Sequence, residues 1–224
     1  MGPSRDAEKT NVARVEGAQA AGRGRSPRLS LAWAATAEGF DFSLHMRRLC
    51  SDIIGRMEQF RHVDIQRVAV SVAQSRNRRL QGLQAKVTPM RFAGGSLVES
   101  RRGRRYTVER IFEGRRELLY ILTFYLPRFL DQPFEEKLTT VFHELYHISP
   151  EFNGDLRRLD GRHYLHTWSQ KRYDAEMREL ARQYLGLVPA DGTTEFMRYT
   201  FRDLQERHGE VVGCRIRRPR LIPL

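Results

Sequence analysis

The sequence predicts an α+β fold, in which a small, mostly antiparallel sheet packs with an N-terminal helix, a central helix and a following support helix. Three observations lead to this prediction. Residues 67–75 alternate β-branched and small or polar side chains, as a strand does. Residues 131–148 repeat apolar side chains at helical spacing. The connections between successive strand candidates are short, which favours antiparallel neighbours.

The 224 residues divide into three parts. Residues 1–38 are rich in Gly, Ala, Arg and Ser without periodicity, so we expect a disordered basic extension. Residues 39–218 form the predicted folded domain, and residues 219–224 a C-terminal tail. The domain should begin with a helix that Asp41 caps and that runs to about Gln59.

Three further strand candidates follow the first strand. Of these, residues 117–127 are apolar on both faces, so this strand should be central or covered. In the second candidate Pro89 indicates an edge or a bulge. After the central helix, residues 169–187 predict a support helix, and Thr200 to Asp203 resemble a capping box for a short helix that ends at Gly209. The two remaining strand candidates are 82–92 and 105–112.

The composition limits the classes of protein. Two cysteines, Cys50 and Cys214, lie far apart and outside any CxxC pattern, which excludes a disulfide framework and a Cys-rich zinc ribbon. No apolar run approaches the length of a membrane span, so we expect no membrane partner and a cytoplasmic location. We interpret residues 29–37 as a docking segment or part of the disordered tail, and not as a signal peptide.

The chain carries a formal net charge of +12, which favours anionic partners such as nucleic acid. An ordinary solvated surface explains such a charge equally well. For the arginine cluster at residues 101–105 we favour the solvated tip of a hairpin over a nucleic-acid clamp.

The predicted central helix contains His143, Glu144 and His147 in the pattern HExxH. Two histidines one turn apart project from the same helix face and can bind one metal ion. Glu144 is rotated from His143 by about 100°, so it borders the metal and can act as general base toward a metal-activated water. The alternative is a surface helix that merely contains His and Glu. The apolar neighbours Phe142 and Leu145 argue against this alternative, because they predict a buried helix.

A catalytic zinc site needs a third protein ligand. The longer pattern HExxHxxGxxH is absent, because Asn153 stands where its last histidine would fall. We prefer His166, which directly precedes the support helix, with His163 and then Asp155 as alternatives; each could instead be an ordinary loop residue or a group that orients a ligand. The full set of candidates is Asp155, Asp160, His163, His166 and Glu176.

Several segments, in order, resemble the phage-type metallopeptidase family of HExxH minimal zincins. They are FHELYHISPEFNGDLRR, HTWSQKRYD, LTFYLPRFL and GLQAKVTPMRF, and the resemblance covers roughly residues 41–187. It implies a zinc cofactor, His166 as third ligand, and a Tyr-Asp pair at Tyr173 and Asp174. Asn153 departs from the aspartate of the family pattern. The resemblance implies no particular substrate.

The sequence therefore predicts a zinc-dependent peptidase, a hydrolase whose peptide or protein substrate lies extended along an edge strand. Tyr164 and Tyr173 are candidates for an oxyanion or substrate contact, with simple packing as the alternative. The alternative function is a basic nucleic-acid-associated binding protein with a structural or vestigial zinc site. Glu144 favours the enzyme, because a structural zinc site has no use for a carboxylate beside its first ligand. No oligomeric state is predicted.

Overall fold

The computed structural model describes residues 14–15, 29–30, 39–75, 81–158, 170–189 and 192–224. The predicted disordered extension and the segment 29–37 therefore lie almost wholly outside the described residues. Two short strands of the extension are described, and both pair in parallel with strands of the folded domain. They are β1 (Arg14–Val15), which pairs with β11 (Val211–Cys214), and β2 (Leu29–Ser30), which pairs with β8 (Ile111–Glu113).

The central sheet has the strand order β4-β10-β5. Its strands are β4 (Val68–Gln74), β10 (Tyr120–Leu126) and β5 (Ala85–Pro89). β10 pairs with β4 in parallel along its whole length. It pairs with β5 in antiparallel orientation from Tyr120 to Phe124. The central place of β10 agrees with its two apolar faces. The parallel pairing with β4 was not expected, because it requires a long excursion of the chain between the two strands.

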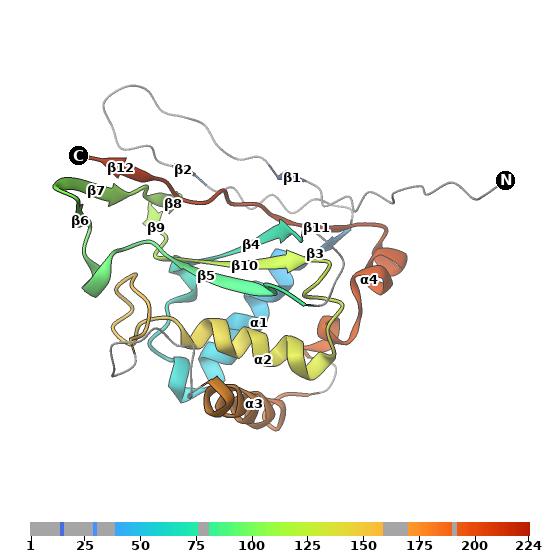
Figure 1. Ribbon diagram of the computed structural model, residues 1–224. Coiled ribbons are helices and arrows are strands. Elements are labelled where there is room, and N and C mark those ends of the chain that lie inside the picture. The colour runs from blue at the N-terminus through green and yellow to red at the C-terminus, as the bar shows by residue number, and fades with distance from the viewer. Residues whose placement is uncertain (1–13, 16–28, 31–38, 76–80, 159–169, 190–191) are drawn as a thin grey trace.

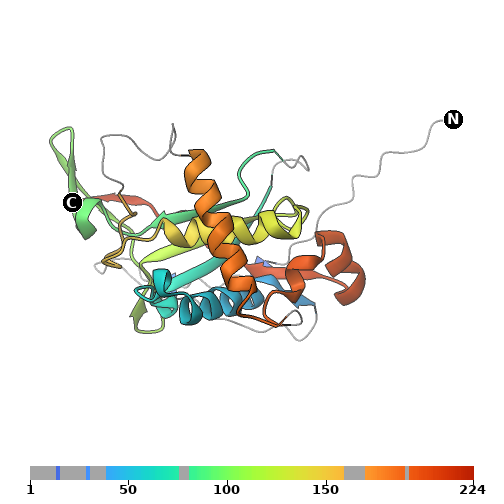
Figure 2. The same cartoon turned by 90° about the horizontal axis from the view of Figure 1, so that it is seen from below.

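Three helices lie on one face of the central sheet (Figure 1). They are α1 (Phe42–Arg56), α2 (Phe134–Tyr146) and α3 (Gln170–Leu185). Figure 2 shows α3 crossing α2 on the side away from the sheet. The main apolar core fills the space between the sheet and these helices, and includes Phe42, Val70, Phe124, Leu138 and Phe142. The α+β fold with mixed, mostly antiparallel sheets is thus confirmed.

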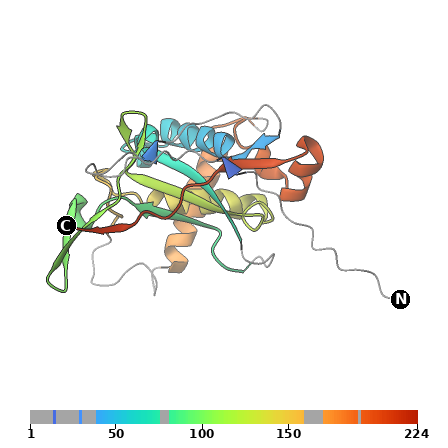
Figure 3. The ribbon, with the colours of Figure 1, turned by 90° about the horizontal axis from the view of Figure 1, so that it is seen from above.

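The excursion between β4 and β10 builds a second, smaller sheet with the order β12-β7-β6 (Figure 3). Its strands are β6 (Val98–Arg101), β7 (Arg104–Val108) and β12 (Leu221–Pro223). Arg102 and Gly103 join β6 to β7 and both have positive φ, as a tight two-residue hairpin turn requires. Residues 221–223, assigned from the sequence to a C-terminal tail, pair with β7.

The remaining elements are short. Helix α4 (Phe201–His208) begins with the predicted capping box, in which the Asp203 N–H donates to the Thr200 hydroxyl and the Thr200 N–H donates to the Asp203 carboxylate. Gly209 ends α4 with a φ of 79°. Asp41 caps α1 as expected, because its carboxylate accepts the Leu44 N–H at 3.0 Å.

Among the described residues no helix combines the length and the apolar character that crossing a membrane requires. The other elements are η1 (Glu58–Phe60), η2 (Ile65–Arg67), η3 (Ala93–Gly95), β3 (Phe40–Asp41), β9 (Arg116–Glu117) and η4 (Glu195–Arg198).

A buried lysine anchors the N-terminal half of α2. Lys137 is 1% exposed, and its ammonium donates to the carbonyl oxygens of Leu130 at 2.6 Å and Tyr199 at 2.8 Å. Burial lowers the pKa of Lys137 to about 8, although the nearby carboxylates of Asp131 and Asp203 oppose this shift. The lysine thus ties α2 to the segment that leads into α4.

We predict that Lys137→Met changes the pH dependence of stability. The folded-state pKa of about 8 lies below the unfolded value of 10.5. Between these two pH values the unfolded chain binds the extra proton, so the wild-type free energy of unfolding rises with pH relative to the variant. Urea unfolding of wild type and variant across this pH range measures the difference between their free energies of unfolding. Groups that titrate in both proteins contribute equally to both and cancel from this difference. Parallel pH profiles would show that Lys137 is not desolvated as described.

Candidate metal centre

Helix α2 presents the HExxH residues in its last turn. Pro133 precedes its first residue, and Glu135 and Glu136 lie in the first turn, where carboxylates interact favourably with the helix dipole. The helix ends at Tyr146, but His147 keeps helical dihedral angles and its N–H donates to the His143 carbonyl at 3.3 Å. The one-turn spacing of the two histidines is therefore preserved to the end of the motif.

The two histidine rings lie next to each other on the part of α2 that contacts Tyr173 of α3. Their centroids are 4.6 Å apart and their planes meet at 78°. Both side chains are partly exposed, and that of His143 is 27% exposed. Two imidazoles at this separation on one helix face fit two of the ligands that zinc takes in catalytic sites.

Glu144 lies on the adjoining part of the helix surface, about 100° from His143, and its side chain reaches the central sheet. It is 8% exposed, and its Oε2 accepts the backbone N–H of Val87 at 2.7 Å. Val87 belongs to β5, the last strand in the order of the central sheet. Burial raises the pKa of Glu144 to about 7, against the opposing effects of the Val87 N–H and the Lys86 ammonium. Its Oε1 has no hydrogen-bond partner among the described residues.

Helix α3 packs two side chains against the histidines. The Tyr173 ring lies 4.8 Å from the His143 ring and 6.0 Å from the His147 ring, and its hydroxyl donates to the His143 carbonyl at 3.3 Å. Burial raises the pKa of Tyr173, so it is a neutral donor. Asp174 Oδ1 is 4.0 Å from His143 Nδ1. This distance is longer than a hydrogen bond, so Asp174 lies near the His143 ring without bonding to it directly.

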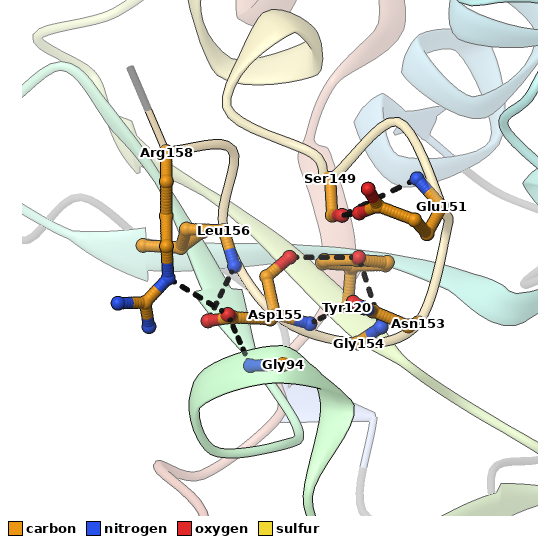
Figure 4. Close-up of polar contacts among 9 residues, drawn as sticks. All are labelled: Gly94, Tyr120, Ser149, Glu151, Asn153, Gly154, Asp155, Leu156 and Arg158. Atoms are coloured by element: carbon orange, nitrogen blue, oxygen red, sulfur yellow. Dashed lines mark hydrogen bonds and ion pairs between the residues drawn. The ribbon is translucent and has the colours of Figure 1, made fainter. Parts of the chain in front are cut away.

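A network of hydrogen bonds holds the loop that follows α2 (Figure 4). The Asp155 carboxylate accepts the N–H groups of Gly94 and Leu156, each at 2.8 Å, and the Arg158 Nε at 3.1 Å. The Tyr120 hydroxyl donates to the Asp155 carbonyl at 2.8 Å and accepts the Gly154 N–H at 3.0 Å. Asp155 therefore fixes this loop to β10 and to η3.

Gly154 allows the close approach on which this network depends. Its φ is 88°, and a Cβ at this position would lie 2.5 Å from Arg91 Cγ. Both features exclude larger residues without a shift of the loop.

Arg157 brings the same loop back to the end of α2. Its backbone N–H donates to the His147 carbonyl at 2.7 Å, and its Nε donates to the Tyr146 carbonyl at 2.8 Å. Its guanidinium also lies 4.0 Å from the centre of the Tyr146 ring. The guanidinium thus satisfies the Tyr146 carbonyl at the end of the helix, where a cation is favourable, and the backbone N–H satisfies that of His147. Sequence reasoning missed this role, because the arginine lies outside the helix that it caps.

The structure brings together some of the predicted site residues. His143, Glu144 and His147 lie in one turn, and Tyr173 packs against the two histidines. Asp155 is engaged in the loop network, and neither it nor Glu176 joins the two histidines, because the described residues contain no group of three or more His, Cys, Asp or Glu that could hold a metal. The remaining candidates, Asp160, His163, Tyr164 and His166, lie outside the described residues.

Comparisons of the chain with protein-family models, with curated proteins and with solved structures return no match. The resemblance to phage-type metallopeptidases therefore stays a prediction from the quoted segments.

We predict that the ring of Tyr173, more than its hydroxyl, holds α3 against the histidines. Tyr173→Ala removes a buried ring beside His143 and should lower the free energy of unfolding by about 3 kcal/mol or more. Tyr173→Phe removes only the 3.3 Å hydrogen bond and should cost less than about 1.5 kcal/mol. Urea unfolding of the metal-free protein measures both. Equal losses in the two variants would assign the role to the hydroxyl.

Proposed function

We propose that this protein is a zinc-dependent peptidase. The observation that carries the proposal is the arrangement of the last turn of α2, in which two adjacent imidazoles are partly exposed and a desolvated carboxylate contacts the edge strand. This arrangement separates metal ligation from base catalysis on a single helical turn. It is the division of roles that HExxH helices use in zinc peptidases.

His143 and His147 would supply two zinc ligands. The third ligand in this proposal is His166, with His163 and Asp155 as alternatives in that order. Asp155 would first have to release the hydrogen bonds that its carboxylate accepts from Gly94, Leu156 and Arg158. This requirement supports the preference for a histidine.

Bound zinc would lower the pKa of water to about 7 and polarise the scissile carbonyl. Glu144 then takes the proton of the attacking water on Oε1, while Oε2 stays on the Val87 N–H. Later Glu144 returns this proton to the leaving amine as the peptide bond breaks. The Tyr173 ring packs against the His143 ring and keeps it in place.

The β5 edge offers a site for the substrate. β5 lies at the end of the order β4-β10-β5 and runs past Glu144. An extended peptide can add to such an edge as a further strand, which would bring its backbone alongside the base. This placement favours unfolded or extended segments of peptides and proteins as substrates.

We predict about one zinc per chain in the purified protein, and loss of this metal in His143→Ala and His147→Ala. His208→Ala is the control, because His208 is exposed on α4, away from the motif. Elemental analysis after supply of zinc measures the content. Wild-type protein without bound transition metal would rule out the proposed metal site.

Zinc affinity, measured by competition with a chelator, distinguishes the third ligand. His166→Ala should weaken zinc affinity by more than the roughly 10–100-fold that loss of an orienting group costs. His163→Ala should fall within or below that range. A larger loss in His163→Ala would make His163 the ligand.

We predict that Glu144→Gln keeps zinc and fold but abolishes peptide hydrolysis. The Gln amide oxygen can still accept the Val87 N–H, but the amide cannot take a proton from water. Cleavage of an unbiased peptide library, followed by mass spectrometry, measures the activity. Glu135→Gln, an exposed change in the first turn of α2, is the matched control and should cleave like wild type. Full activity of Glu144→Gln would show that another group is the base.

A further inference from the structure

Two arginine-rich segments far apart in the sequence lie in one small sheet. The segment 101–105 forms the tip of the β6-β7 hairpin, and the segment 215–220 leads into β12. The pairing of β12 with β7 brings them together, and the Glu109 N–H donates to the Arg220 carbonyl at 2.8 Å. Residues 98–109 and 215–220 contain eight arginines and two glutamates. This net charge of +6 is half of the +12 of the whole chain.

Only two of these eight arginines are neutralised by acidic side chains of the described residues. Arg101 pairs with Glu99, and Arg217 pairs with Glu109, which accepts its Nη1 at 2.8 Å. No acidic partner among the described residues pairs with the other six, and most of these six are exposed. They are Arg102, Arg104, Arg105, Arg215, Arg218 and Arg220.

The shape of this basic surface is that of a projecting ribbon. Figures 2 and 3 show the β6-β7 hairpin extending from one end of the molecule, beside the C-terminus. The two strands of such a hairpin lie about 5 Å apart. Beside β12 the ribbon has three strands, and the Leu224 N–H donates to the Arg105 carbonyl at 3.0 Å, so the two-stranded part is the tip at residues 101–104. A two-stranded tip fits the major groove of B-form DNA, which is about 12 Å wide.

The sequence alone favours a solvated hairpin tip at residues 101–105, but the structure adds the charge of residues 215–220 to it. We therefore propose that the β12-β7-β6 sheet, named here the arginine sheet, binds the phosphate backbone of duplex DNA. Guanidinium groups bind phosphates with two parallel hydrogen bonds, and the surface contains arginine without lysine. A hairpin tip in the major groove would place its arginines close to the phosphates of both DNA strands. Residues 215–220 would add positive charge where the hairpin joins the rest of the sheet. The arginine sheet lies on the opposite side of the central sheet from α2 and α3, so this binding is independent of the proposed peptidase site (Figure 1).

An anionic membrane is the competing partner. Leu97, Leu221 and Leu224 border the arginine sheet and are 49%, 45% and 66% exposed. Such side chains could enter a lipid surface beside the arginines. The balance of side chains favours DNA, because six arginines without acidic partners among the described residues stand against only these three leucines, and charge dominates binding to the DNA backbone.

The test is DNA binding by fluorescence anisotropy, with a labelled random-sequence duplex and increasing salt. The triple variant Arg102→Gln/Arg104→Gln/Arg105→Gln should bind about tenfold more weakly or worse, and its slope of log affinity against log salt should flatten by about 2–3 units. Arg218→Gln/Arg220→Gln should flatten the slope by about 1–2 units. These changes should leave thermal unfolding and zinc content unchanged, because the altered side chains are exposed and far from the motif.

The matched control is Arg48→Gln/Arg61→Gln/Arg202→Gln. It removes the same charge from exposed positions outside the arginine sheet and should leave the slope of the wild type. An equal effect of the control would overturn the proposal, because it would make the binding a property of net charge. Wild-type binding to phosphatidylserine vesicles without binding to DNA would also overturn it, in favour of a membrane partner.

Discussion

The burial of α2 between the central sheet and α3 determines where the site residues lie. Leu138, Val141 and Leu145 are fully buried and fix the rotation of the helix about its axis. Once that rotation is set, the step of about 100° between successive residues directs Glu144 toward β5 and leaves the two histidines partly exposed beside Tyr173 of α3. The chemistry of the site is therefore a consequence of the apolar stripe that packs the helix.

The loop after α2 holds the C-terminal end of the helix in place. A helix leaves its last carbonyl groups without partners inside the helix. Here Arg157 satisfies the carbonyls of Tyr146 and His147, and the Asp155 network then ties the loop to β10. His147 lies at the C-terminal end of α2 and keeps helical dihedral angles. The contacts of Arg157 with this end of the helix therefore hold the second histidine in position. The buried carboxylate of Asp155 acts as a structural clamp, and this explains why it lies apart from the histidine pair.

Much of the fold could be read from local signals. The Asp41 cap, the capping box at Thr200 and the hairpin turn at residues 101–104 all occur as predicted, because each depends on hydrogen bonds or dihedral angles within a few residues. The parallel pairing of β4 with β10 was missed. Several other strands lie between β4 and β10 in the sequence. Their pairing depends on burial of both faces of β10 in the folded core, and no local sequence pattern encodes it.

By itself the sequence determined the helical HExxH turn and the types of side chain that it presents, since one helical turn is a local structure whose geometry follows from its spacing. Only the tertiary structure decided which partners those side chains meet: Val87 beside Glu144, Tyr173 beside the histidines, and Asp155 in the loop network. It likewise joined the arginines of residues 215–220 to the hairpin at 101–105. These contacts link residues that are distant along the chain, and packing of the whole core, rather than any single segment, selects them.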